Sequence, residues 1–289
     1  MIRAGGHTMK NVSRFSVRLA AAMLLSLGFG SFALAAGEEG QAEPKYIDWS
    51  FSGIFGTYDE HQLQRGFQIF REVCSSCHSA NLIAFRNLSE HGGPAYSEEQ
   101  VKALAAEYRI MDPEAAEGER AAITADRWPA PFTSEREARE ANGGALPPDF
   151  SVLAKARGMG KPFPGWLFNY FTAYQEGGAD YVYNLLTNYH DEAPAGTEIP
   201  EGKYYNAFFH GNAIAMAPPL SDGAIAYEEP GVPQTVDQYA EDVSAFMMWM
   251  ADPHMVSRKE AGLRALIFLI LLSGLLYLTK RKLWANIAH

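Results

Sequence analysis

Apolar residues recur at helical spacing in several segments of the chain, whereas strict alternation of apolar and polar residues never lasts beyond a few positions. Three segments follow residues that cap helices: Asp59, then Ser97 with Gln100, then Thr235 with Gln238, the last two pairs being capping-box patterns. The apolar positions are Leu63, Phe67, Phe70 and Cys74; Val101, Leu104 and Tyr108; Val182, Leu185, Leu186 and Tyr189, preceded by Gly177-Gly178; and Tyr239, Val243, Phe246, Met247 and Met250. This pattern predicts a mainly α fold with long loops.

Two longer apolar runs lie near the ends of the chain. Residues 1–35 combine basic residues with an apolar run and end in Ala33-Leu34-Ala35, which is typical of a secretory signal peptide. Residues 261–278 contain one charge, Arg264, and as a helix they would be about 27 Å long, close to the roughly 30 Å hydrocarbon core of a bilayer. A buried core helix is the alternative, but Lys280-Arg281-Lys282 follows at once, as it does after many membrane anchors.

These runs predict the order of the domains. Residues 1–35 are expected to be removed, residues 36–256 to form a periplasmic head, residues 257–280 to anchor it in the bacterial inner membrane, and residues 281–289 to form a short cytoplasmic tail. About 220 residues suffice for one domain with its own core. Within the head, residues 112–142 are rich in Glu, Ala and Arg, and we expect them to form a surface excursion around Trp128.

The charge of the exported head indicates which classes of partner it can attract. Without the first 35 residues the chain has 34 acidic and 20 basic residues, a net charge of −14, and without the three basic residues of the tail the head carries about −17. Such a field repels nucleic acid and attracts a basic protein. The alternative is that the acidic surface only maintains solubility.

The only two cysteines stand in Cys74-Ser75-Ser76-Cys77-His78, which is typical of c-type haem attachment. The two sulfurs would form thioethers to one haem c, and His78 would ligate its iron. The competing interpretation is a thiol–disulfide pair, but that motif belongs in a βαβ context, and here a predicted helix leads into Cys74. This helix and the one after Thr235 are expected to cross over one haem edge, with Gly66 allowing close approach and Phe246 or Trp249 filling the contact.

The second axial ligand decides whether the iron has an open site. Met216 is favoured because Pro218 and Pro219 restrict the backbone beside it, and a thioether ligand raises the reduction potential. Met247 and Met250 lie on an apolar helix face, where core packing explains them better. The rivals left open are Met111, Met159, His91, His190, His210 and His254.

Six segments resemble the cytochrome c1 family. They are RGFQIF (65–70), VCSSCHS (73–79), AFRNL (84–88), NGGALPPD (142–149), GADYV (178–182) and IAMAPP (214–219). The resemblance implies a cytochrome c-like helical haem domain in a dimeric cytochrome bc1 complex, ubiquinol–cytochrome c oxidoreductase of the respiratory chain. It implies that the haem accepts an electron from the Rieske iron–sulfur protein, beside cytochrome b, and passes it to a soluble cytochrome c. The chain would then have no catalytic centre of its own.

The resemblance also implies roles for single residues. Met216 is the distal ligand, Pro147 and Pro148 lie near the haem, and Asn142, Arg157 and Tyr181 would contact its propionates. The chain departs from the family in two ways: residues 158–176 form an aromatic insert that could lie against neighbouring subunits, membrane lipid or the head itself, and no cysteine is left to brace the Met216 loop with a disulfide. Rigidity would then depend on the prolines and on packing by Tyr204, Tyr205, Phe208 and Phe209.

Two other functions share parts of this pattern. A membrane-anchored cytochrome c that feeds a terminal oxidase usually has its methionine nearer the haem motif, whereas here 138 positions separate His78 from Met216. A thiol–disulfide oxidoreductase would contain no haem.

Overall fold

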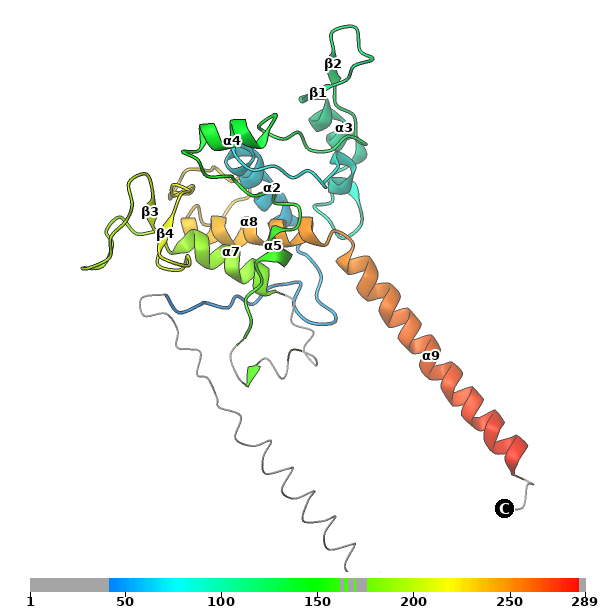
Figure 1. The fold of residues 1–289 in the computed structure, drawn as a ribbon. Coiled ribbons are helices and arrows are strands. Elements are labelled where there is room, and N and C mark those ends of the chain that lie inside the picture. The colour runs from blue at the N-terminus through cyan, green and yellow to red at the C-terminus, as the bar shows by residue number, and fades with distance from the viewer. Residues whose placement is uncertain (1–41, 162–163, 166–168, 170–175, 286–289) are drawn as a thin grey trace, which may run out of the picture. The chain divides into compact units, whose positions relative to one another are not determined.

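The computed structural model describes residues 42–161, 164–165, 169 and 176–285. The predicted signal peptide and most of the aromatic insert lie outside the described residues. The prediction of a mainly helical fold is confirmed (Figure 1). The α-helices are α2 (Glu60–Glu72), α3 (Glu98–Ala106), α4 (Glu135–Ala141), α5 (Leu153–Ala156), α7 (Gly177–Thr187), α8 (Val236–Ala251) and α9 (Met255–Trp284). Two 3-10 helices, η2 (Cys74–Ser76) and η3 (Phe85–Ser89), and two antiparallel pairs, β1 (Arg109–Met111) with β2 (Glu119–Ala121) and β3 (Tyr204–Tyr205) with β4 (Ala213–Ile214), complete the described elements.

The helices begin where the polar residues predict, with two differences of detail. The Asp59 carboxylate accepts a hydrogen bond from the Gln62 amide at 2.7 Å, and both bonds of the capping box at Ser97 are present. Thr235 caps α8, but the Gln238 side chain donates to Asp242 at 3.1 Å instead, so the second box is incomplete. Helix α7 begins at Gly177 and includes the glycine pair that was expected to precede it.

The crossing of α2 and α8 organises the head. A Cβ atom added to Gly66 would lie 2.2 Å from the carbonyl oxygen of Asp242 and 2.6 Å from the Cβ of Phe246, so only glycine fits between the two backbones. Beside the crossing, Arg65 donates two hydrogen bonds to the buried Asp242 carboxylate, at 2.9 and 3.0 Å. Trp249 packs against Phe246 in a tilted arrangement with ring centroids 5.2 Å apart. The predicted close approach is confirmed.

The core includes part of the segment that was expected to lie on the surface. Trp128 is only 4% exposed and packs against Phe67, Phe70 and Phe85 at centroid distances of 5.0 to 5.6 Å. A surface excursion over the whole of residues 112–142 was therefore wrong. Since Glu- and Arg-rich sequence surrounds this tryptophan, its burial follows from the aromatic cluster on α2 and η3 and not from local pattern.

Helix α9 has the length and composition to span a membrane. It contains 30 residues, and none of its most apolar 18-residue window is buried against the rest of the chain. It begins earlier and ends later than the predicted anchor at 257–280. Its first turn packs on the head through the buried Met255 and Val256. Between α8 and α9, Asp252 accepts hydrogen bonds from Lys155 at 2.5 Å and from Arg258 at 2.6 and 2.7 Å, and these fix the junction.

Candidate functional site

The two cysteines lie on a tight turn at the end of α2. The amides of Cys77 and His78 both donate to the Cys74 carbonyl, at 3.1 and 2.9 Å, and the Ser75 hydroxyl donates to the Arg71 carbonyl at 2.8 Å. The turn therefore places Cys74, Cys77 and His78 together without any contribution from distant residues. Both cysteines are half-buried free thiols, so no disulfide occupies them.

The imidazole of His78 is oriented by the segment that contains Pro148 and Phe150. Its Nδ1 lies 2.9 Å from the Pro148 carbonyl oxygen, which can only accept, so Nδ1 carries the proton and the Nε2 lone pair is left to bind a metal. The ring also stacks on Phe150 with centroids 4.2 Å apart. Burial lowers the pKa of His78 although the bond to Pro148 opposes this, and the neutral form is the one that ligates iron.

Asp149 ties the proline segment to the cysteine turn. Its carboxylate accepts hydrogen bonds at 2.8 Å each from the Ser79 hydroxyl, the Asn81 amide and the Ser151 amide. Burial raises the pKa of Asp149, but the three hydrogen-bond donors together lower it by more, so the pKa lies below its ordinary value. The Phe150 amide donates to the Ser79 carbonyl at 2.8 Å. The turn that carries His78 is thus joined to the proline segment, which lies 70 positions later in the sequence.

The environment of Cys74 does not suit a redox-active thiol. Burial raises the pKa of Cys74 to about 12, and the neighbouring Cys77 raises it as well. Nucleophilic cysteines have a lowered pKa, because the thiolate is the reactive form. The site therefore disfavours thiol–disulfide exchange and is compatible with sulfurs that are held in thioether bonds.

The loop that contains Met216 is braced by hydrogen bonds. The Tyr189 hydroxyl donates to the Met216 carbonyl at 3.1 Å, and β4, immediately before this loop, pairs with β3. Next to β3, the fully buried Asn206 donates to the Leu185 carbonyl at 2.7 Å and accepts from the amides of residues 208 and 209 at 3.0 and 2.9 Å. This network stiffens the loop in place of the missing disulfide.

Packing contributes less to this loop than the sequence suggested. Tyr205 and Phe208 are buried and Phe209 is half-buried, but Tyr204 is 43% exposed and adds little. Met216 itself is half-buried. The rival histidines, His91, His190, His210 and His254, are all exposed, as is Met111, whereas Met159 is half-buried and Met247 and Met250 are buried in the core as expected.

Two of the residues implied to contact propionates come from elements that touch each other. Burial raises the pKa of Tyr181, and the positive charge of Arg157 acts in the opposite direction. They come from the end of α5 and the first turns of α7, which touch so closely that a Cβ on Gly178 would overlap the Ala154 carbonyl. Asn142 is used differently, because its side chain donates to the Ala138 carbonyl at 2.7 Å and caps α4.

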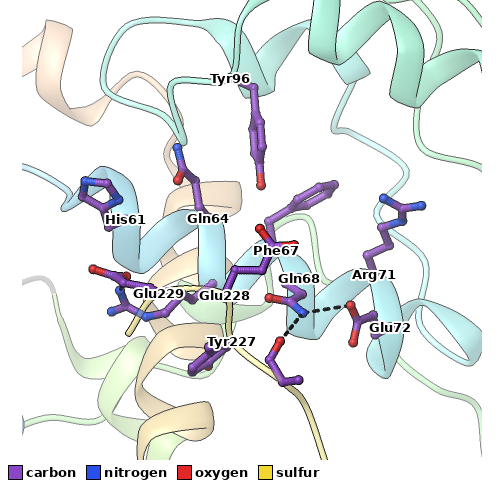
Figure 2. A pocket seen from close by; sticks show the side chains of 12 residues that line it. His61, Gln64, Phe67, Gln68, Arg71, Glu72, Tyr96, Tyr227, Glu228 and Glu229 are labelled. Carbon is purple, nitrogen blue, oxygen red and sulfur yellow. Dashed lines mark hydrogen bonds and ion pairs between the residues drawn. The ribbon is translucent and has the colours of Figure 1, made fainter. Parts of the chain in front are cut away.

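Two hollows are found among the described residues, and one of them includes Tyr181. One of about 620 Å³ follows α2, and Figure 2 shows Tyr96 and Tyr227 on either side of that helix. It is lined by none of the residues implied for haem. A smaller hollow of about 260 Å³ includes Tyr181 and Met159. The site is therefore recognised by its side chains and not by a hollow. The two unpaired thiols of Cys74 and Cys77, beside the neutral imidazole of His78 with its free nitrogen, fit a covalently attached haem.

Comparison with known proteins identifies relatives over most of the chain. The model of the cytochrome C1 family matches residues 49–287. A cytochrome b/c1 of Bradyrhizobium diazoefficiens is 48% identical over 280 residues, which are 96% of this chain and 40% of that protein. A cytochrome c1 of Blastochloris viridis is 40% identical over 272 residues, 93% of this chain and 96% of its own. The mitochondrial cytochrome c1 heme protein of Saccharomyces cerevisiae is 39% identical over 258 residues, 88% and 76% of the two chains. This chain therefore spans about two fifths of the Bradyrhizobium relative and nearly all of the Blastochloris one.

Proposed function

The chain belongs to the cytochrome c1 family, and from this membership and the site we propose that it is the haem c subunit of a cytochrome bc1 complex. In this role it accepts one electron from a Rieske iron–sulfur protein and passes it to a soluble cytochrome c. It has no catalytic centre of its own, and the ubiquinol–cytochrome c oxidoreductase activity belongs to the assembled complex.

The observation that carries the proposal is the position of His78 beside the two free thiols. Cys74 and Cys77 would hold one haem c by thioether bonds, and His78 Nε2 and Met216 Sδ would be its axial ligands. When bound, the haem supplies reversible one-electron chemistry at its iron. The chain keeps the His78 ring in one orientation and one tautomer through the Pro148 carbonyl and Phe150, and it keeps the Met216 backbone in place through Tyr189.

Arg157 and Tyr181 would bind a propionate. A guanidinium and a phenol can both donate to one carboxylate, and the positive charge offsets the cost of burying it. Arg157 is exposed and makes no ion pair with another described residue. Pro147 and Pro148 would lie against the haem face on the His78 side. Asn142 would contact a propionate only if its hydrogen bond to the Ala138 carbonyl broke, and otherwise it holds the end of α4.

The proposed setting follows from the apolar runs. Residues 1–35 export the chain, residues 36–256 form the periplasmic haem domain, and α9 crosses the bacterial inner membrane once, in contact with lipid. The partners are cytochrome b and the Rieske protein in a dimeric complex, and a basic soluble cytochrome c, whereas the net charge opposes nucleic acid.

Extraction of membranes with a mild detergent tests the proposal. The protein is expected to retain its haem through denaturation and acid acetone, because thioethers survive both, and to purify with a di-haem cytochrome b and an iron–sulfur protein. Colourless denatured protein would contradict the haem assignment and favour thiol chemistry. If the haem-bearing protein purified with a terminal oxidase instead, the result would favour a membrane-anchored cytochrome c that feeds the oxidase over a subunit of the bc1 complex.

A further inference from the structure

The loop at residues 51–56 combines a buried base with an exposed apolar tip. Phe51 is buried, stacks on Trp49 with ring centroids 5.3 Å apart, and packs against the tilted ring of Tyr58 at 5.0 Å. At the tip, Ile54 is 56% exposed and Phe55 is 73% exposed. Two adjacent large apolar side chains in water lose the free energy that burial of their surface would provide.

The backbone of this loop is tightly specified. The Ser52 amide donates to the Trp49 carbonyl at 3.0 Å, and the Thr57 amide donates to the Ser50 carbonyl at 3.2 Å, which closes the base. Gly53 has a φ of 72°, and a Cβ on Gly56 would lie 2.1 Å from the Ser52 carbonyl oxygen. The exposure of Ile54 and Phe55 is therefore built into the loop.

The loop is attached to the first turns of α9. Lys259 donates to the carbonyls of Phe51 and Gly56, at 2.9 and 3.0 Å, and these two residues flank the exposed tip. Lys259 lies two residues before the apolar run begins at Ala261, which is a rise of about 3 Å along the helix. The polar layer on each side of the hydrocarbon core is about 5 to 7 Å thick. In a chain whose α9 crosses the bilayer, the anchoring carbonyls would therefore lie at the level of the headgroups.

We propose that the loop at residues 51–56 is a second membrane contact, with Phe55 and Ile54 inserted among the lipid headgroups beside α9. The occupant is lipid because the loop is joined to the residue that enters the bilayer, and aromatic side chains are favoured in this layer. The contact would limit rotation of the head about α9. The inference depends on α9 crossing the membrane and not on the redox role of the chain.

Spin labels on the full chain in the assembled complex test this contact. Phe55→Cys and, separately, Ile54→Cys are labelled with a nitroxide in bilayers of phosphatidylcholine and phosphatidylglycerol, and relaxation by oxygen is compared with relaxation by a water-soluble nickel chelate. Oxygen concentrates in lipid and the chelate stays in water. The wild-type chain gives the background from Cys74 and Cys77.

Two control positions calibrate the measurement. Met111→Cys, on β1, replaces an apolar side chain that is 77% exposed in the head, and Leu271→Cys replaces one that is 64% exposed in the middle of α9. We expect the oxygen-to-nickel ratio at positions 54 and 55 to be several times that at position 111 and below that at position 271. A ratio equal to that at position 111 would refute lipid contact. Shielding from both reagents would show a protein subunit over the loop and refute it as well. A water-accessible label at position 271 would show that α9 does not cross the membrane and would refute the proposed contact, but it would leave the haem assignment unaffected.

Discussion

Replacement of Gly66 by alanine tests whether the crossing of α2 and α8 supports the haem site. The new Cβ would lie 2.2 Å from the Asp242 carbonyl oxygen and 2.6 Å from the Phe246 Cβ, whereas ordinary contacts begin near 3.4 Å. The two helices would therefore have to separate by roughly 1 Å, since neither obstacle is a flexible side-chain end. Separation would strain the Arg65–Asp242 hydrogen bonds and displace the end of α2, which leads into Cys74.

The expected cost follows from two opposing effects. Insertion of a methyl group into a packed contact costs about 1 to 3 kcal/mol or more, and this contact is at the severe end because it involves backbone. Alanine recovers about 0.8 to 1 kcal/mol through its higher helix propensity. A net loss of about 2 kcal/mol or more in the free energy of unfolding is expected.

Guanidinium unfolding of the detergent-solubilised protein, followed by helical circular dichroism and by the Soret band, measures this loss. Gly158→Ala is the matched control, because its Cβ would meet nothing within 4 Å, and its midpoint should not fall. The Gly66→Ala midpoint should fall, together with the yield of haem-bearing protein. An unchanged or higher midpoint would refute the close-contact reasoning.

Three further outcomes are expected. Met216→Leu removes the proposed thioether, so redox titration of membranes should show a lower midpoint potential and carbon monoxide should bind the reduced protein; prompt binding by the wild type would overturn the ligand assignment. Asp149→Asn should cost about 1 to 3 kcal/mol near neutral pH. Folding lowers the pKa of Asp149, so its contribution to stability is present above the unfolded value near 3.9 and is lost as the pH falls through the folded value. The unfolding midpoints of wild type and variant should therefore converge below about pH 4. A constant difference between the two midpoints would contradict this. Added salt should slow electron delivery to a basic cytochrome c, given a head charge of about −17, and a flat salt profile would count against charge steering.

Long-range contacts determine features of the head that no local sequence pattern predicts. Trp128 lies in Glu- and Arg-rich sequence, yet it is buried because aromatic residues of α2 and η3 surround it. The Pro148 carbonyl fixes the tautomer of a histidine 70 positions away. Both depend on which segments meet in space, which periodicity does not report. Asn142 was implied as a haem contact, but its side chain caps α4 through a local hydrogen bond to Ala138, four residues before it.

The sequence by itself determined the features that depend on neighbouring residues. Cys74, Cys77 and His78 are brought together by one turn, Asp59 and Ser97 cap the helices that follow them, and the apolar run in α9 is continuous. Only the tertiary structure decided how His78 is oriented, what braces the Met216 loop and where Phe55 lies relative to α9. The physical reason is that capping and helical spacing act over three or four residues, whereas the hydrogen bonds that hold His78 and the Met216 loop join segments tens of residues apart.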